Sequence, residues 1–162
     1  MSADAIAAIR AWTRLDQAIT GFNRVLAQEY GVTGAQLAVL RLVGEWAGEG
    51  TVSLGDMRER LVMHPATLGQ LLDRLAARRL VSIDPDPADR RRRLVGLTGA
   101  GRRLVDRAPV AGPVRLRYVD VDPVRLQRLA AALEDAVALF GLEEYLHDRS
   151  GKPGERRPEA GG

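Results

Sequence analysis

The chain has 162 residues, enough for one domain of ordinary size or for one domain with an added helical extension. Hydrophobic residues make up 46% of it, yet no stretch approaches the roughly 20 unbroken apolar residues of a membrane-spanning helix. The cysteine count of 0 excludes disulfides and thiol-based redox switches, and residues 1–4 lack the charged-then-apolar pattern of a secretory signal. We therefore expect a soluble, cytoplasmic protein.

The formal net charge is +3, and almost all basic side chains are arginine, since Lys152 is the single lysine. A guanidinium group binds an oxyanion through two hydrogen bonds in a fixed geometry, which an ammonium group does not. The bias therefore favours phosphate or carboxylate partners. A GC-rich genome would produce the same excess of arginine. The interpretation therefore depends on where the arginines lie.

Apolar residues recur every three or four positions over residues 6–30, which predicts a long first helix that is buried along one stripe. Gly31 ends this helix. Thr33, with Gln36 three residues later, forms a capping box and predicts the start of a second helix over residues 34–46.

A loop and a very short strand are expected next, at residues 48–52, because two glycines precede a β-branched pair. Ser53 then caps a third helix, which ends near Leu61. Proline is favoured at the first position of a helix, so Pro65 predicts a fourth helix over residues 65–78.

Residues 80–83 and 93–98 are predicted to pair as a β-hairpin. Between them, residues 84–92 hold two prolines, three aspartates and a run of arginines, the composition of a solvated turn that projects outward. A fifth helix follows, until prolines between residues 109 and 113 interrupt it. A last helix begins at residue 123, and residues 150–162 are predicted to be a disordered tail.

This order of elements is typical of a winged helix-turn-helix domain, whose second motif helix enters the DNA major groove. The expected fold class is mainly α with a small β-hairpin wing, with dimerisation helices at the N- and C-terminal ends. The fourth predicted helix would then read DNA, and the hairpin would be the wing.

Small or polar residues near the start of a reading helix allow close approach to base edges, and Ala66, Thr67 and Gln70 meet that need. Glutamine bonds bidentately to adenine, while threonine and alanine contact the thymine methyl group. Arg74, one turn further, and Ser53 are placed for phosphate groups.

His64 is expected to be a helix cap or a DNA-facing residue. The wing arginines Arg90, Arg91 and Arg92 suit an adjacent minor groove, whose negative potential attracts guanidinium groups. An isolated run of this kind is more often a solvated surface. The short spacing between the reading helix and the basic tip is what favours DNA binding.

At these residues the chain resembles the MarR family of bacterial transcriptional regulators. The resemblance covers about residues 5–146. It is carried by residues 32–36 with Leu40, the run 65–75, Leu80 with Val81, Asp89 to Arg91 with Val95, Leu97 with Thr98, and Gly101.

The resemblance implies that residues 1–149 form a single unit, with a DNA-binding lobe at 34–98 and dimerisation helices at 1–30 and 99–149. It also implies that Asp73 pairs with Arg91 as a strut of the wing, which leaves Arg90 or Arg92 as the groove probe. Small aromatic or anionic effectors would bind in a cleft between the dimer arms and the reading head.

Two departures from the family pattern matter. The family usually has glycine after the reading helix, whereas this chain has Arg79, and a left-handed backbone there would cost about 1 kcal/mol. Either a phosphate contact compensates this cost, or the turn after the helix has another backbone conformation than in the family. The connection at residues 108–122 is also interrupted by prolines, so the last helices need not follow the usual long path.

Apolar residues at helical spacing near both ends of the chain are expected to form a homodimer interface: Ile6, Ile9, Leu126, Leu133, Val137 and Phe140. The alternative is that the C-terminal stripe packs inside one subunit. A symmetric dimer predicts a palindromic operator whose half-sites lie on the order of 10 base pairs apart. Trp12, Phe22 and Trp46 either line the effector cleft or belong to the core.

An enzyme is not expected, because the sequence has no phosphate loop or nucleophile motif, and no cofactor is implied. No metal site is expected either. His147 follows Glu143 and Glu144 at the spacing of a surface metal site, but an exposed polar end is favoured. The predicted function is a homodimeric regulator, expected to be a repressor, that binds double-stranded DNA. The alternative is a winged-helix module that binds an acidic protein.

Overall fold

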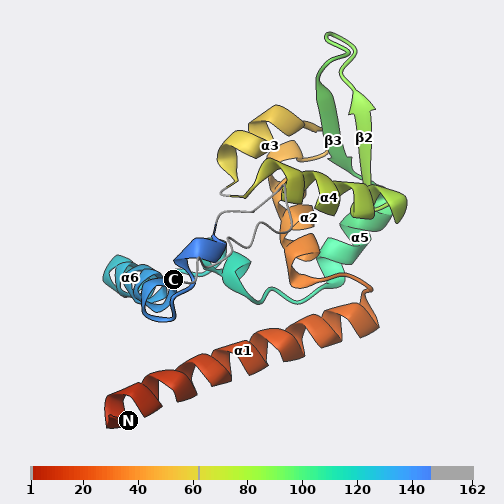
Figure 1. Cartoon of the computed structure of the whole chain (residues 1–162). Coiled ribbons are helices and arrows are strands. Elements are labelled where there is room, and N and C mark those ends of the chain that lie inside the picture. The colour runs from red at the N-terminus through yellow and green to blue at the C-terminus, as the bar shows by residue number, and fades with distance from the viewer. Residues whose placement is uncertain (1, 62, 147–162) are drawn as a thin grey trace, which may run out of the picture. The chain divides into compact units, whose positions relative to one another are not determined.

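The computed structural model describes residues 2–61 and 63–146, and the chain divides into two compact units between Val119 and Asp120. The first unit contains α1 (Ala3–Glu29), α2 (Gly34–Ala47), β1 (Val52–Ser53), α3 (Leu54–Arg60), α4 (Pro65–Ala77), β2 (Val81–Pro85), β3 (Arg93–Leu97), α5 (Gly99–Arg107) and the 3-10 helix η1 (Pro113–Arg117). The second contains α6 (Pro123–Leu139) and the 3-10 turn η2 (Glu143–Tyr145) (Figure 1).

The predicted helix starts are confirmed by their caps. The Thr33 hydroxyl accepts from the Gln36 main-chain N–H at 3.2 Å, and the Gln36 side chain accepts from the Thr33 N–H at 2.9 Å. Ser53 Oγ likewise accepts from the main-chain N–H of Asp56 at 3.0 Å. Each cap satisfies main-chain donors that the first helical turn leaves unpaired.

The three strands form one antiparallel sheet in the order β1, β3, β2. The hairpin of β2 and β3 pairs Val81 with Leu97 and Pro85 with Arg93, and it projects away from the helices (Figure 1). The predicted short strand is confirmed as β1, in which Val52 lies opposite Val95. The sheet thus fixes the base of the wing against the helical body.

The core of the first unit lies around α2, which contacts β3, α4 and α5. Its members are apolar side chains spaced three or four residues apart on the helices, so each helix buries one face. The side chains with less than 2% exposure include Leu26, Leu37, Leu40, Val43, Met57, Leu68, Leu72, Leu75 and Val95.

The turn after α4 has the left-handed backbone that the sequence analysis considered for Arg79. Arg79 has φ +56°, which is strained for a residue with a side chain. Its carbonyl accepts a hydrogen bond of 2.7 Å from the Thr98 hydroxyl, and its N–H donates to the Ala76 carbonyl at 2.8 Å. Contacts within the protein therefore hold this conformation.

Two helices bury very little surface in a single copy of the chain. Leu26 is the one buried residue of the 27-residue α1, and α6 has none. Exposed apolar residues on α1 include Ile9 and Leu15, and those on α6 include Leu129 and Leu133. The two helices therefore present apolar surface that their own units leave open.

Some expectations fall on other parts of the chain. The predicted tail at residues 150–162 and His147 lie outside the described residues. Within the described residues, no helix combines the length and apolar character needed to cross a bilayer.

Candidate nucleic-acid interface

Helix α4 presents a polar face because its apolar side chains are used in the core. Leu68, Leu71, Leu72 and Leu75 are buried at helical spacing. The opposite face is therefore open, and it carries the predicted base-reading and phosphate-binding residues, all exposed: Ala66, Thr67, Gln70 and Arg74.

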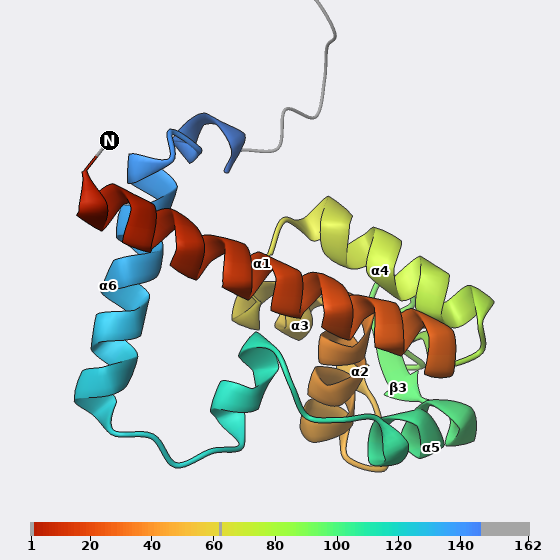
Figure 2. The ribbon, with the colours of Figure 1, turned by 90° about the horizontal axis from the view of Figure 1, so that it is seen from below.

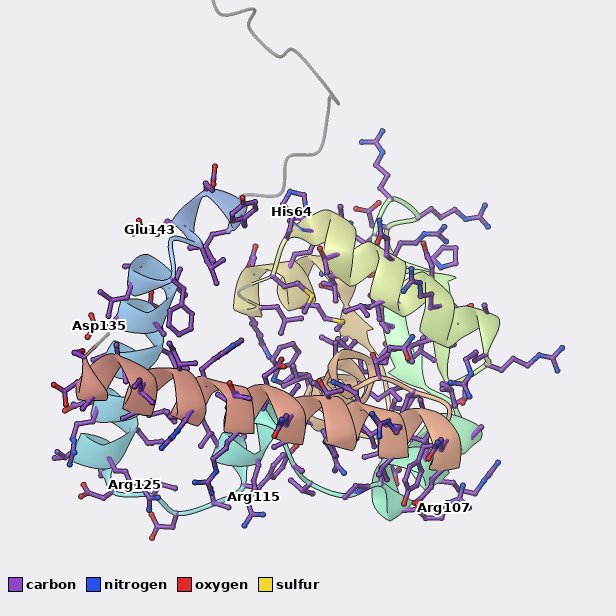
Figure 3. The ribbon with its side chains drawn as sticks, turned by 60° about the horizontal axis from the view of Figure 1, so that its bottom comes forward. His64, Arg107, Arg115, Arg125, Asp135 and Glu143 are labelled. Atoms are coloured by element: carbon purple, nitrogen blue, oxygen red, sulfur yellow. The ribbon has the colours of Figure 1, made fainter. Side chains whose placement is uncertain are left out.

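The start of α4 is held by His64, which stands at the end of the turn that precedes the helix (Figure 3). Its Nδ1 accepts from the Ala66 main-chain N–H at 3.2 Å, so the predicted cap is confirmed. The imidazole is exposed, and the residue directly precedes the first turn of the reading helix. His64 thus combines a structural bond with a place beside the candidate interface.

Ser53 is the predicted cap of α3, but the structure gives no support to its predicted phosphate contact. Its side chain is only 6% exposed, and its hydroxyl is engaged as the cap of α3. Burial leaves little surface for a phosphate group, so the structure supports a capping role for this residue.

The wing tip is organised by its two aspartates. Asp86 Oδ1 accepts from the Ala88 N–H at 2.9 Å, and Asp89 Oδ1 accepts from the Arg91 N–H at 3.0 Å. Short acidic side chains commonly stabilise turns in this way. The carboxylates are therefore directed to the main chain.

Arg90, Arg91 and Arg92 are all exposed at this tip. Among the residues that the structure describes, the only ion pair joins Arg117 to Glu45, so no carboxylate pairs with a wing guanidinium. The strut implied by the family resemblance, between Asp73 and Arg91, is consequently not formed in this structure. The three arginines remain open to an anionic partner.

A hollow of about 460 Å³ lies between α3 and the residues that lead from the wing tip into β3. Apart from Ser53 and two arginines, its lining was not anticipated from the sequence, because it depends on the packing of α3 against β3. The lining residues are Ser53, Leu54, Gly55, Asp56, Arg58, Glu59, Arg91, Arg92 and Arg93. Three consecutive wing arginines thus border a concave surface that continues from the tip.

A second cavity, of about 300 Å³, is apolar and lies where α1, α2 and the segment after α5 meet. Of the three aromatics predicted for an effector site, Phe22 lines it. Trp46 instead lies under the Arg60 guanidinium, 5.4 Å from it, and Trp12 lies on α1 outside the lining. The remaining lining residues are Ile19, Asn23, Gly34, Ala35, Ala38, Ala111, Gly112, Pro113 and Val114.

Asn23 is a residue of this cavity that sequence reasoning missed. Its Oδ1 accepts from the Gly34 main-chain N–H at 2.7 Å and so joins α1 to the first turn of α2. A polar residue in the middle of a long apolar helix is a weak signal by itself. Only the approach of the two helices gives it a role.

Arg41 is a buried charge that the sequence analysis also missed. It is 9% exposed, and its Nη2 donates to the carbonyls of Ala108 at 2.7 Å and Pro109 at 3.4 Å. Its Nε has no hydrogen-bond partner within the described part of the chain. These bonds hold the end of α5 to α2.

The neighbouring ion pair joins η1 to α2. Arg117 Nη2 lies 2.5 Å from Glu45 Oε1, and hydrogen bonding to this carboxylate raises the pKa of the guanidinium above its usual value. The pair is well exposed, so its contribution to stability is small. In the described residues, no group of three or more acidic, histidine or cysteine side chains is placed to hold a metal ion.

Comparison with known proteins adds independent observations. The sequence profile of the MarR family matches residues 30–92. Transcriptional regulator HosA of Escherichia coli O157:H7 is 36% identical over 100 residues, which cover 62% of this chain and 67% of HosA. HTH-type transcriptional repressor NicR of Pseudomonas putida is 39% identical over 57 residues, which cover 35% of this chain and 36% of NicR.

HosA of Escherichia coli O111:H- is 39% identical over 74 residues, which cover 46% of this chain and 53% of that relative. This chain therefore matches between about a third and two thirds of the length of these relatives.

Solved structures of this fold extend over most of the chain. Sco5413, a MarR family transcriptional regulator from Streptomyces coelicolor, has a TM-score of 0.54 and 26% identity, and the match covers 86% of this chain and 97% of that one. A MepR like protein complexed with pseudoligands has a TM-score of 0.61 at 18% identity and covers 85% and 95%. A mutant MarR of Escherichia coli complexed with operator DNA has a TM-score of 0.50 at 22% identity, with coverage of 80% and 95%.

Proposed function

This chain belongs to the MarR family of transcriptional regulators, and on that premise we propose that it regulates transcription by binding specific double-stranded DNA sequences. Its family is one of regulators and not of enzymes. A protein that binds the bacterial chromosome acts in the cytoplasm. The repressor NicR among its relatives favours repression as the mode of action.

One observation supports this function above the others: α4 exposes Thr67, Gln70 and Arg74 on one face. The wing arginines, which follow in the sequence, have no acidic partner within the part of the chain that the structure describes. The helix face suits base edges in the major groove, and the guanidinium groups suit a minor groove or phosphates. A winged helix-turn-helix domain uses these two elements together. Arg74 and Arg91 are the residues we assign to phosphate contacts.

The regulator is proposed to act as a homodimer. The exposed apolar residues of α1 and α6, among them Ile9 and Leu133, are the surfaces that a second copy would cover. Ile6, Leu126 and Val137 are half-buried on the same helices. Two copies related by a two-fold axis would read a palindromic operator with half-sites about 10 base pairs apart.

Selection of bound duplexes from a random DNA pool, followed by fluorescence anisotropy titrations, tests the function. The selected sequence should bind on the order of 1,000-fold more tightly than a scrambled duplex. Its affinity should fall steeply with salt, since each neutralised phosphate contributes about −0.9 to the slope of log K against log salt. Equal binding of both duplexes would favour a protein-interaction module instead.

The apolar cavity at the α1–α2 junction is the proposed effector site. Its lining contains no basic side chain, and Asn23 supplies its polar group. The cavity therefore favours an uncharged small aromatic ligand over an anionic one, because an unpaired charge is costly to bury.

Phenol, indole and benzoate are suitable probes of this preference. Thermal shift assays should show stabilisation by the two neutral compounds and not by benzoate. Ala38→Leu fills the cavity and should remove that stabilisation, while Ala27→Leu, on the exposed side of α1, should retain it. A stabilisation that survives Ala38→Leu would place the ligand elsewhere.

A further inference from the structure

The side chain of Arg78 binds the C-terminal end of the reading helix to the C-terminal end of α1. Arg78 is the C-cap residue of α4, and its Nη1 donates to the Gly31 carbonyl. Its Nη2 lies 3.5 Å from the Tyr30 carbonyl. Both carbonyls follow the last turn of α1, where the unpaired carbonyls and the helix dipole favour a cation.

Gly31 makes this approach possible. Its φ of +65° is left-handed, and a Cβ at this position would lie 2.6 Å from Arg78 Nη2. A larger residue would therefore both strain the backbone and displace the guanidinium. The glycine that ends α1 also opens the space that the arginine of α4 fills.

Tyr30 fixes the same junction from the other side. Its hydroxyl donates to the Arg107 carbonyl at 3.1 Å, which ties the end of α1 to the end of α5. Figure 2 shows that the end of α1 reaches the ends of both α4 and α5, and Figure 3 marks Arg107 there. The junction is thus anchored to the body independently of Arg78.

The residue after Arg78 is also held. The Arg79 carbonyl accepts from the Thr98 hydroxyl at 2.7 Å, so the turn that follows α4 is attached to the start of α5. The end of the reading helix therefore lies between two attachments, one to α1 through Arg78 and one to α5 through Thr98.

We propose that Arg78 is a positioning residue that sets the direction of α4 relative to α1. The inference rests on the proposed function, because α1 is the helix that we assign to the dimer interface. In a dimer, the angle between α1 and α4 sets the distance between the two reading helices. Arg78 thereby determines which half-site separation the regulator accepts.

Operators with altered spacing test this role. The selected operator is lengthened or shortened by one and two base pairs between its half-sites, and affinities are measured for wild type, Arg78→Met, Arg78→Lys and the control Arg103→Met. Arg103 is an exposed arginine of α5, so its replacement removes the same charge at another place. Wild type and control should prefer one spacing by about 100-fold.

Arg78→Met should bind the neighbouring spacings within about tenfold of the original, because α4 is less firmly directed. Arg78→Lys keeps the positive charge but loses the two guanidinium donors that reach two carbonyls. Its preference for one spacing should therefore lie between those of wild type and Arg78→Met. An equal loss of affinity at every spacing, with a shallower salt dependence, would make Arg78 a phosphate contact and overturn the proposal. An unchanged spacing profile would overturn it too.

A measurement without DNA separates this proposal from the proposed function. The chain has no cysteine, so Gln28→Cys on α1 and Gln70→Cys on α4 allow two spin labels to be placed in a small fraction of otherwise unlabelled protein. Pulsed electron paramagnetic resonance should give a narrow distance distribution, and Arg78→Met or Arg78→Lys should broaden it. This distance distribution tests the positioning role even if the wild type fails to bind DNA selectively. A broader distribution in the variants supports the role, and an unchanged width rejects it.

Discussion

At the residue scale, Gly101 illustrates how closely α5 packs on the turn that leads into the wing. A Cβ built at Gly101 would overlap the Leu80 main-chain carbonyl, whereas one at Gly69, in the middle of α4, would have nothing within 4 Å. This carbonyl lies directly before β2 and accepts from the Thr98 N–H at 3.1 Å, so it cannot move aside cheaply. Close packing therefore requires a glycine at position 101, whereas it does not require one at position 69.

We expect Gly101→Ala to lower the free energy of unfolding by about 1–3 kcal/mol, the usual effect of overpacking. Gly69→Ala is the matched control and should raise it by up to about 1 kcal/mol, since alanine is the better helix former. Urea denaturation followed by circular dichroism measures both. A Gly101→Ala variant as stable as the wild type would contradict the packing described above.

The wing strut is a second question at this scale. Since Asp73 and Arg91 form no ion pair in the structure, we expect their alanine variants to change DNA affinity independently. The free energies of binding lost in Asp73→Ala and Arg91→Ala should add within about 0.5 kcal/mol in the double variant. A double variant little worse than either single variant would show that the strut forms on DNA.

Residues with local roles were predictable from the sequence, and residues with long-range roles were not. Thr33 caps a helix that begins next to it, so its role is visible in the residues that follow. Arg78, Asn23 and Arg41 act on carbonyls or N–H groups at least 11 residues away in the chain. Their roles depend on which helix ends meet, and sequence periodicity does not determine that.

At the scale of elements, the wing combines rigid pairing at its base with open charge at its tip. The tip is closed by the Asp86 N–H, which donates to the Arg92 carbonyl at 2.9 Å, and by the turn centred on Asp89. The composition of residues 84–92 predicted a charged turn correctly. It did not distinguish aspartates that neutralise arginines from aspartates that bind the main chain, because both would be acidic residues in a basic loop.

We expect Arg90→Ala and Arg92→Ala each to weaken binding to the selected operator and to reduce the salt slope by about 1, as loss of one phosphate or groove contact does. Arg115→Ala, an exposed arginine of η1, is the control of equal charge change and should leave the slope unaltered. Anisotropy titrations between about 50 and 200 mM salt give these slopes. Equal slopes for the wild type and both wing variants would exclude the tip from the interface.

At the scale of the whole molecule, the apolar surface of α1 and α6 is the feature that a single copy leaves unexplained. Ile9 is 50% exposed and Leu133 is 48% exposed. Large exposed apolar areas mark interaction surfaces, and here they lie on helices that contribute almost nothing to the core.

Ile9→Glu and Leu133→Glu should convert the dimer to a monomer, because each places a charge in an apolar interface. Gln127→Glu adds the same charge at an exposed polar position of α6 and should remain dimeric. Multi-angle light scattering gives the masses, and affinity for a two-half-site operator should fall on the order of 100-fold when the linkage is lost. A dimeric Leu133→Glu variant would place the interface elsewhere.

The division of the chain was less predictable than its elements. The prolines after residue 108 indicated an interrupted connection, and the structure has its unit boundary nearby, between Val119 and Asp120. Where the boundary falls depends on bonds such as those of Arg41 and Arg117, which keep the connecting segment on α2. Those contacts join parts of the chain more than 60 residues apart.

Thr98 joins three elements of the reading unit. One hydroxyl donates to the carbonyl after α4, accepts from the N–H of Gly101 at 3.0 Å, and stands directly after β3. The turn after the reading helix, the end of β3 and the start of α5 consequently meet at one hydrogen-bonded residue. We therefore expect the amides around this residue to exchange with solvent together, through one shared opening of the DNA-binding surface.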